Sequence, residues 1–137
     1  MVVKKSQSVK EQVSRQLLPM VRKPARYIGG EINQIRKDPA QIQIRVGLCF
    51  PDIYEIAMSH TGLAILYEVL NRIPAVAAER IFAPWLDAEE IMRKERIALF
   101  SLESRTAAAD FDILGFSMTN ELCYTNLLNM LDLAGLE

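Results

Sequence analysis

Two short apolar stretches decide the fold of this 137-residue chain: QIQIRVGLCFP at residues 41–51 and FDILGFS at residues 111–117. In the first stretch, apolar and polar residues alternate up to Val46 and are followed by an unbroken apolar run that ends before Pro51. This pattern predicts a strand whose end is buried on both faces, and the second stretch predicts another such strand. Strands of this kind are typical of parallel sheets with helices on both sides.

Helical patterns follow the predicted strands. We expect one helix from Gly62 to Pro74, a second after Asp87 and a third from about Glu121 to Gly135, a glycine that suits a left-handed C-terminal cap. The core faces of the first and third helices are expected to contain Leu63, Leu66, Val69, Leu70 and Ile73, and Tyr124, Leu127, Leu128 and Leu131. Residues 80–84 are a short strand candidate, and residues 97–102 are a further candidate whose partner is unclear.

The alternation of strands and helices predicts an α/β fold with a partial doubly wound parallel sheet, Rossmann-like or flavodoxin-like. In the flavodoxin order the third strand joins the first on the side opposite the second, and a fourth strand covers the outer edge of the third. The sequence contains no fourth strand. Because a bare apolar edge invites pairing, we expect a sheet truncated before its fourth strand, or two copies paired edge to edge.

The chain is basic before the first strand and acidic after it. Residues 1–45 contain ten Lys and Arg against three Asp and Glu, a charge of +7, and the remainder contains six against fourteen, a charge of −8. We therefore expect a basic, partly disordered leader over residues 1–40 and the α/β domain over residues 41–137. A charged leader usually keeps a chain soluble or folds back on an acidic remainder, and the alternative is that it binds phosphates or an acidic partner.

Local patterns subdivide the leader. Residues 1–10 lack periodicity and are expected to be disordered, and Val13 begins a short apolar pattern that predicts a helix ending near Pro19. The segment of residues 23–33 contains Pro24 and the pair Gly29-Gly30. Proline and paired glycines indicate a loop that turns sharply and approaches another part of the molecule closely.

Several classes of protein are excluded by composition. No apolar stretch approaches the ~20 residues that cross a bilayer, and the charged N-terminus lacks the apolar core of a secretory signal, so we expect a cytoplasmic protein without membrane contact. Nucleic-acid binding is a minor option for the leader. Cys49 and Cys123 are expected to be free thiols of a reducing compartment.

A ligand of an open parallel sheet binds beyond the carboxyl ends of its strands, where the first and third strands diverge. Two loops meet there in the predicted fold, residues 50–63 and 117–121. The residues that we expect to bind a cofactor are Pro51, Asp52, Tyr54, Glu55, Ser59, Thr61, Gly62, Ser117, Thr119 and Asn120. Their polar groups suit hydrogen bonds to a ligand edge, although Ser, Thr and Asn at such positions also serve as ordinary helix caps.

No residue of these loops is expected to be catalytic or to bind a metal. Asp52 and Glu55 resemble an acid–base pair, but no nucleophile accompanies them, so a structural role is favoured.

Five segments carry a family resemblance: RKPARYIGGEIN (22–33), FPDIYEIAMS (50–59), RIFAPW (80–85), LFSLES (99–104) and DILGFS (112–117). In this order they resemble the N-terminal region of uncharacterised B12-binding radical SAM proteins, from about Leu17 to the last residue. The resemblance implies a cobalamin-binding-type domain and, elsewhere in the parent protein, a barrel with a [4Fe-4S] cluster and S-adenosylmethionine.

The chain departs from that whole-protein pattern in three places. A radical SAM cluster needs three closely spaced cysteines, whereas this chain has two, so the cluster and S-adenosylmethionine are expected only in the missing part of the parent protein. The glycine-rich loop of a fourth strand, which would hold the nucleotide tail of cobalamin, is missing. Met58 stands where an aspartate would orient a cobalt-ligating histidine, so His60 is expected to be a loop or cap residue.

Two functions follow as expectations. The first is an accessory module that binds a cobalamin-like cofactor, while catalysis belongs to a radical SAM barrel, for example on an adjacent chain. The second is a non-catalytic interaction domain without corrin binding, which docks a partner or a second copy through the edge of its third strand. A stand-alone hydrolase or transferase is disfavoured because the sequence has no activated nucleophile, metal set or phosphate loop.

Overall fold

The computed structural model describes residues 8–136. Three parallel strands form one open sheet in the order β2-β1-β3, where β1 is Ile44–Phe50, β2 is Val76–Phe82 and β3 is Ile113–Phe116. The α/β class and the partial doubly wound, flavodoxin-like order are confirmed, because the third strand lies beside the first on the side opposite the second.

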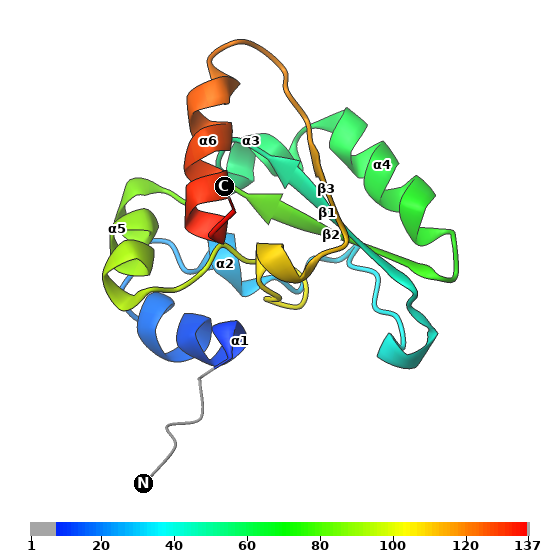
Figure 1. The fold of residues 1–137 in the computed structure, drawn as a ribbon, viewed down its shortest axis with the longest axis horizontal. Helices are drawn as coiled ribbons and strands as arrows, with labels where there is room; N and C mark the ends of the chain where they lie inside the picture. Colours follow the sequence, from blue (N-terminus) through cyan, green and yellow to red (C-terminus); the bar gives the residue numbers. More distant parts are fainter. Residues whose placement is uncertain (1–7, 137) are drawn as a thin grey trace, which may run out of the picture.

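Helices cover the sheet from two sides, with α4 (Thr61–Asn71) on one side and α5 (Leu86–Glu95) and α6 (Cys123–Ala134) on the other (Figure 1). The shorter elements are α1 (Val9–Gln12), a π-helix (Val13–Leu17), α2 (Ala25–Ile28), α3 (Tyr54–Met58) and 3-10 turns at Pro39–Gln41 and Ala108–Asp110. No helix within residues 8–136 is long and apolar enough to cross a membrane.

Each side of the sheet has its own apolar core. On the α4 side, Val46 and Leu48 of β1 pack with Leu63 and Tyr67 of α4. The larger core on the other side unites strand residues with α5 and α6, and includes Cys49, Ile81, Met92, Met130 and Leu133. Burial of β1 from both sides explains its unbroken apolar run.

The described part of the basic leader packs against the larger core. Val13 and Leu17 are fully buried there, and Tyr27 is 8 % exposed. The predicted helix before Pro19 is confirmed. Of the residues expected to be disordered, 1–7 lie outside the described part of the chain. The expectation was wrong for the other three, since Ser8 caps α1 and Val9 and Lys10 belong to it. A boundary near residue 40 remains a prediction.

The close approach predicted for the glycine pair is confirmed at Gly29. Its φ of +71° lies in the region that favours glycine, and a Cβ there would come 2.4 Å from the carbonyl oxygen of Leu102. Glycine at this position therefore lets α2 lie directly against the segment after β2 and α5.

The predicted core faces of two helices were wrong in part. In α4, Leu63 is buried and Leu70 packs against the core as expected. Leu66 and Val69 of α4, and Ile73 just after its end, are instead about half exposed. In α6 the buried residues are Cys123, Met130, Leu133 and Ala134, whereas Tyr124 and Leu128 are 60 % and 64 % exposed. The apolar stripe that periodicity identifies is in both cases wider than, or rotated from, the face that the sheet covers.

Two strand assignments also change. The strand predicted at residues 80–84 begins at Val76 and ends at Phe82. Residues 97–102 do not form a strand: Phe100 makes a single antiparallel bridge to Ala107, and the N–H of Leu99 donates to the carbonyl of Leu133. This segment runs between α5 and the 3-10 turn at Ala108–Asp110, and its end contacts the sheet through the N–H of Leu102, which donates to the carbonyl of Arg80 in β2.

The two edges of the sheet differ. On the outer edge of β2, the Asn71 amide donates to and accepts from the backbone of Ala78, at 3.0 Å each. Further along, the Arg80 N–H donates to Glu103 and its carbonyl accepts from the N–H of Leu102, both at 2.8 Å. Within residues 8–136, β3 pairs with β1 alone.

Candidate functional site

The carboxyl ends of the three strands meet at one edge of the sheet. The N–H of Ser117 donates to the carbonyl of Cys49 at 2.9 Å, and the N–H of Ala83 donates to the carbonyl of Asp52 at 3.1 Å. Asn126 of α6 donates its side-chain N–H to the carbonyl of Pro51 at 3.0 Å. The loop after β1 is thus held between the loops after β2 and β3, as the parallel sheet predicted.

The loop after β3 presents polar side chains to the exterior. Thr119 and Asn120 are exposed, and the Asn120 side-chain oxygen accepts the N–H of Leu122 at 3.0 Å, so it begins the turn into α6. This loop lines an open hollow of about 210 Å³ together with Met118, Glu121 and Tyr124. Asn120 therefore caps the turn into α6, the structural role considered above, and the face of the loop that lines the hollow is exposed to solvent.

Cys123 lies in the first turn of α6, beneath this loop, and is 5 % exposed. A hydrogen bond with the Thr119 hydroxyl and backbone N–H groups of Thr119 and Asn120 lower the pKa of its thiol, although burial and Asp52 oppose this. Burial alone raises the pKa of Cys49 to about 12. Both thiols are free, as expected, but only Cys123 belongs to the strand-end region.

Tyr54 and Glu55 contact the leader rather than the loop after β3. The Tyr54 hydroxyl donates to Glu31 at 2.6 Å, and burial, aided by this carboxylate, raises its pKa to about 12. Glu55 accepts from the Arg26 Nε at 2.9 and 3.0 Å. Partial burial works against ionisation of Glu55, but its own backbone N–H, Arg26 and Lys23 together lower its pKa.

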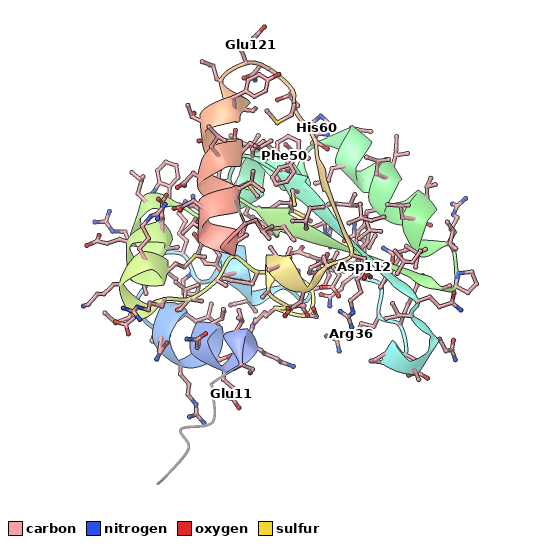
Figure 2. All side chains as sticks on the ribbon, viewed as in Figure 1. Glu11, Arg36, Phe50, His60, Asp112 and Glu121 are labelled. Atoms are coloured by element: carbon pink, nitrogen blue, oxygen red, sulfur yellow. The ribbon has the colours of Figure 1, made fainter. Side chains whose placement is uncertain are left out.

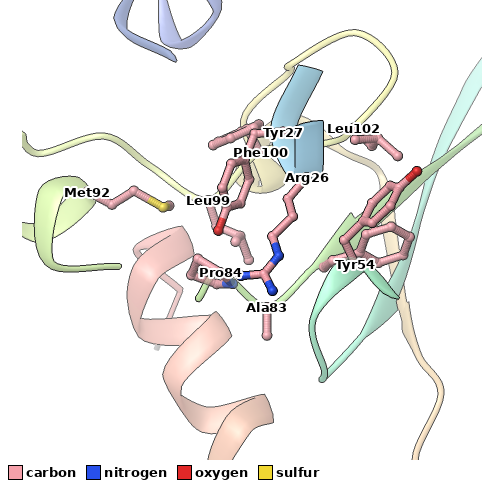
Figure 3. Close-up of a pocket in the computed structure, with 10 residues that line it drawn as sticks. Arg26, Tyr27, Tyr54, Ala83, Pro84, Met92, Leu99, Phe100 and Leu102 are labelled. Carbon is pink, nitrogen blue, oxygen red and sulfur yellow. The ribbon is translucent and has the colours of Figure 1, made fainter. Parts of the chain in front are cut away.

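Arg26 extends into a small pocket beyond the end of β2 (Figure 3). The pocket has a volume of about 20 Å³, which suits about one water molecule. The Arg26 guanidinium also lies 5.3 Å from the ring centre of Trp85, and the backbone N–H of Trp85 donates to the hydroxyl of Tyr27 at 3.1 Å. This arrangement attaches the leader to the end of β2 and has no room for a cofactor.

His60 is a helix cap. Its Nδ1 accepts the N–H of Leu63 at 3.2 Å, and its ring lies 4.9 Å from that of Phe50 near the same end of the sheet (Figure 2). An accepting Nδ1 places the proton of the neutral ring on Nε2, which then has no lone pair for a metal. The prediction of a cap histidine is confirmed. Within residues 8–136, no three His, Cys, Asp or Glu side chains are grouped to hold a metal ion.

The structure divides the ten predicted site residues into two groups. Pro51, Asp52, Ser117, Thr119 and Asn120 surround the junction of the first and third strands. The other five are Tyr54, Glu55, Ser59, Thr61 and Gly62, and they belong to α3, to α4 or to the turn between them. The Ser59 hydroxyl donates to the carbonyl of Ile56, and Gly62 lies against the His60 ring.

Three residues near these sites were not selected from the sequence. Asn126 and Cys123 were assigned to a helix, and Arg26 to a basic leader. The signal for Arg26 was its place beside the glycine pair, since such a pair indicated a close approach. No pattern in the sequence indicates that the Asn126 amide reaches Pro51, because that contact depends on the rotation of α6.

Comparison with known protein families matches residues 62–137, more than half of the chain, to the family described as radical SAM proteins, N-terminal. No curated protein and no solved structure matches the chain. The matched segment begins in α4 and includes β2, β3 and α6, so it contains the loops after the second and third strands. The chain therefore belongs to the radical SAM N-terminal family.

Proposed function

We propose that this chain is an accessory, non-catalytic module of a radical SAM protein, and that the carboxyl edge of its sheet binds one side of a cobalamin-type cofactor. The observation that supports this proposal is that the loops after β1 and β3 lie at the same edge of the sheet, at the switch point where open parallel sheets bind ligands. The exposed Thr119 and Asn120 border the open hollow at this point.

The chemistry of these groups fits the rim of a corrin rather than its metal. A corrin carries amide side chains around its ring, and the Thr119 hydroxyl, the Asn120 amide and the Asp52 carboxylate are suitable hydrogen-bond partners for them. The Nδ1 of His60 accepts the N–H of Leu63 and so caps α4. We therefore propose contacts to the periphery of the cofactor and none to cobalt.

When bound, cobalamin supplies cobalt-centred chemistry that side chains lack. The role that we propose for this chain is to position the cofactor. The Asn126 contact with Pro51 and the Ser117 contact with Cys49 hold the two loops at a fixed separation. Two cysteines are too few for a radical SAM cluster, so the cluster and S-adenosylmethionine are assigned to another part of the parent protein.

Equilibrium binding of hydroxocobalamin tests the proposal. The purified chain is mixed with hydroxocobalamin and filtered, and the corrin absorbance that stays with the protein is measured. We expect a retained, saturable band that Thr119→Val with Asn120→Ala weakens at least tenfold. Thr125→Val, a matched change at an exposed position of α6, is expected to leave it unchanged. A colourless retained fraction with the unmodified chain would exclude the proposal.

A second candidate function, docking of another polypeptide along β3, is favoured by the contrast between the two sheet edges. Side chains of Asn71 and Glu103 bond to backbone groups on the outer edge of β2, whereas in the described part of the chain no side chain bonds to the outer edge of β3. Backbone N–H groups along a strand point alternately to its two edges. Since the N–H of Ser117 donates to β1, those of Leu114 and Phe116 point to the outer edge of β3. Hydrogen exchange at low protein concentration tests this: these two amides should exchange much faster than those of Ala78 and Arg80, and equal protection would contradict an open edge.

A further inference from the structure

A hollow of about 310 Å³ lies beside β2, near the amino ends of the first two strands. Its volume is in the range of sites for small molecules, ~300–1,000 Å³. Ala77 and Ala78 of β2 line it, and leader residues between 34 and 42 form much of the rest. In the sheet order β2-β1-β3, this edge is opposite to β3. The hollow is therefore bounded by described parts of this chain and does not depend on any strand beyond β3.

The hollow lies apart from the proposed cofactor site. Figure 2 shows Arg36, one of its lining residues, toward the amino ends of the strands and away from Phe50 and His60. The proposed cofactor contacts, Thr119 and Asn120, belong to the loop after β3 at the carboxyl ends. A function of the hollow is therefore independent of cobalamin binding.

Four basic side chains line the hollow, and in the described part of the chain only one of them has an acidic partner. The four are Lys10, Arg36, Lys37 and Arg45. The paired one is Arg45, which lies 3.6 Å from Glu79. The other acidic residue of the lining, Glu103, forms its ion pair with Arg80, which is not part of the lining. Within residues 8–136, three positive charges of the hollow therefore remain without a counter-ion.

Lys37 is fixed beside the hollow by backbone carbonyls. Its ammonium donates to the carbonyls of Ile73 and Val76, at the junction of α4 and β2. Carbonyls carry only partial charge, and a charged side chain that is partly removed from water is normally paired with an opposite charge. An ammonium has three N–H groups, so one remains for a ligand. An anion in the hollow would complete the surroundings of this lysine.

A buried polar network orients Arg45. Glu79 is 9 % exposed, and its carboxylate accepts the hydroxyls of Ser101 and Ser104 at 2.6 Å each. These bonds fix the carboxylate, and the Arg45 guanidinium lies against it at a distance longer than a direct hydrogen bond. The paired N–H groups of the guanidinium are therefore available to a ligand.

We propose that this hollow binds a small molecule that carries a phosphate group. A phosphate monoester has a charge of about −1.5 to −2 at neutral pH, which matches the surplus of positive charge better than a single carboxylate does. Arginine binds phosphate through paired N–H groups and lysine binds it as a point charge. The lining also includes Ile35, Pro39 and Ile42, whose apolar surface suits the organic part of a phosphate ester.

A nucleic acid is a weaker alternative for these basic residues. Residues that bind a polymer of phosphates usually extend along one face or one helix. Here they converge from α1, the leader and β1 on one concave site, which concentrates their field. The chain's own N-terminal residues do not supply the counter-ion, because residues 1–7 contain two lysines and no acidic residue.

Isothermal titration calorimetry of the 137-residue chain with ribose 5-phosphate tests the proposal. Low ionic strength is used because salt screens such attraction. We expect saturable binding of one molecule per chain, weaker binding of inorganic phosphate and no binding of ribose, since the phosphate supplies the main attraction and the organic part adds contacts. Arg36→Gln and Lys10→Gln, which change separate elements, should each weaken the binding of ribose 5-phosphate at least fivefold.

Arg22→Gln is the matched control. It removes the same charge from an exposed position of the leader outside the hollow, so it should change the affinity less than twofold. Circular dichroism checks that each variant is folded. Hydroxocobalamin takes no part in the measurement, so a failure of this proposal is distinguishable from a failure of the proposed function.

Three results would overturn the proposal. The first is the absence of binding by ribose 5-phosphate, or an affinity for it no higher than that for inorganic phosphate. The second is equal weakening by Arg36→Gln and Arg22→Gln, which would indicate general attraction to a basic leader. The third is tighter binding of a single-stranded RNA oligonucleotide that depends on Arg22 as much as on Arg36, which would assign these residues to nucleic acid.

Discussion

Glu103→Gln should be among the most destabilising single changes in this chain, because Glu103 neutralises a buried arginine. The side chains of Glu103 and Arg80 are each 4 % exposed, and the carboxylate accepts from the Arg80 Nε at 2.5 Å and from the Arg80 backbone N–H at 2.8 Å. Burial raises the pKa of Glu103 although Arg80 opposes it, as expected for a carboxylate largely removed from water. Of the two terminal nitrogens of Arg80, one donates to the side-chain oxygen of Asn33 at 3.4 Å and the other has no hydrogen-bond partner among the described residues, so Glu103 is the main partner of the guanidinium.

The size of the effect follows from the charge that is left behind. Removing one partner of a buried ion pair costs ~3–5 kcal/mol, because the other charge remains out of water without compensation. Glutamine keeps the shape and one accepting oxygen, so we expect about 3 kcal/mol for Glu103→Gln. Stacking of the guanidinium on Tyr67, 4.3 Å from the ring centre, offsets only a part of this loss.

Urea unfolding followed by circular dichroism measures this effect. With a urea m-value of ~2 kcal/mol/M, the midpoint should fall by roughly 1.5 M. Glu68→Gln, in the exposed pair with Arg72, is the control and should change stability by less than about 0.5 kcal/mol. The double variant Arg80→Met with Glu103→Gln should recover most of the loss, since both charges are then gone. A loss below about 1 kcal/mol for Glu103→Gln would refute the interpretation that the pair is buried and essential.

Three further predictions concern other parts of the chain. Gly29→Ala should cost about 2–4 kcal/mol in unfolding experiments, because its Cβ would meet the Leu102 carbonyl and its φ is +71°, whereas Gly30→Ala, with open space around it, should cost less. Glu55 has a lowered pKa, so its contribution to stability is present above the ordinary glutamate pKa and is lost as the pH falls through the lowered value. In acid titrations, the difference in stability between the unmodified chain and Glu55→Gln should therefore shrink over that pH range. A difference that stays constant with pH would contradict this prediction. Iodoacetamide should modify Cys123 at lower pH and faster than Cys49 when followed by mass spectrometry, and Thr119→Val should slow that reaction; preferential labelling of Cys49 would disprove it.

The strand-end region shows how far sequence reasoning reaches. Parallel strands require that the loops after Phe50 and Phe116 lie at the same edge, and the contact of Ser117 with Cys49 confirms this. The same reasoning placed Tyr54 and Glu55 in the cofactor site. Their partners are instead Glu31 and Arg26, which are more than twenty residues earlier in the chain. Such pairings depend on where the leader docks, and no local pattern encodes that position.

The sequence by itself predicted the first and third strands and the parallel direction of the sheet, because a strand buried on both faces must be apolar along its whole length and strands that alternate with helices run parallel. The full length of the second strand and the choice of the flavodoxin-like order came from the tertiary structure. Only the tertiary structure decided which side of each helix is buried. Apolar residues occupy more of α4 than the sheet covers, because Leu63 and Tyr67 are buried whereas Leu66 and Val69 are about half exposed. Periodicity measures the amphipathic character of a helix, whereas burial depends on what lies beside it in space.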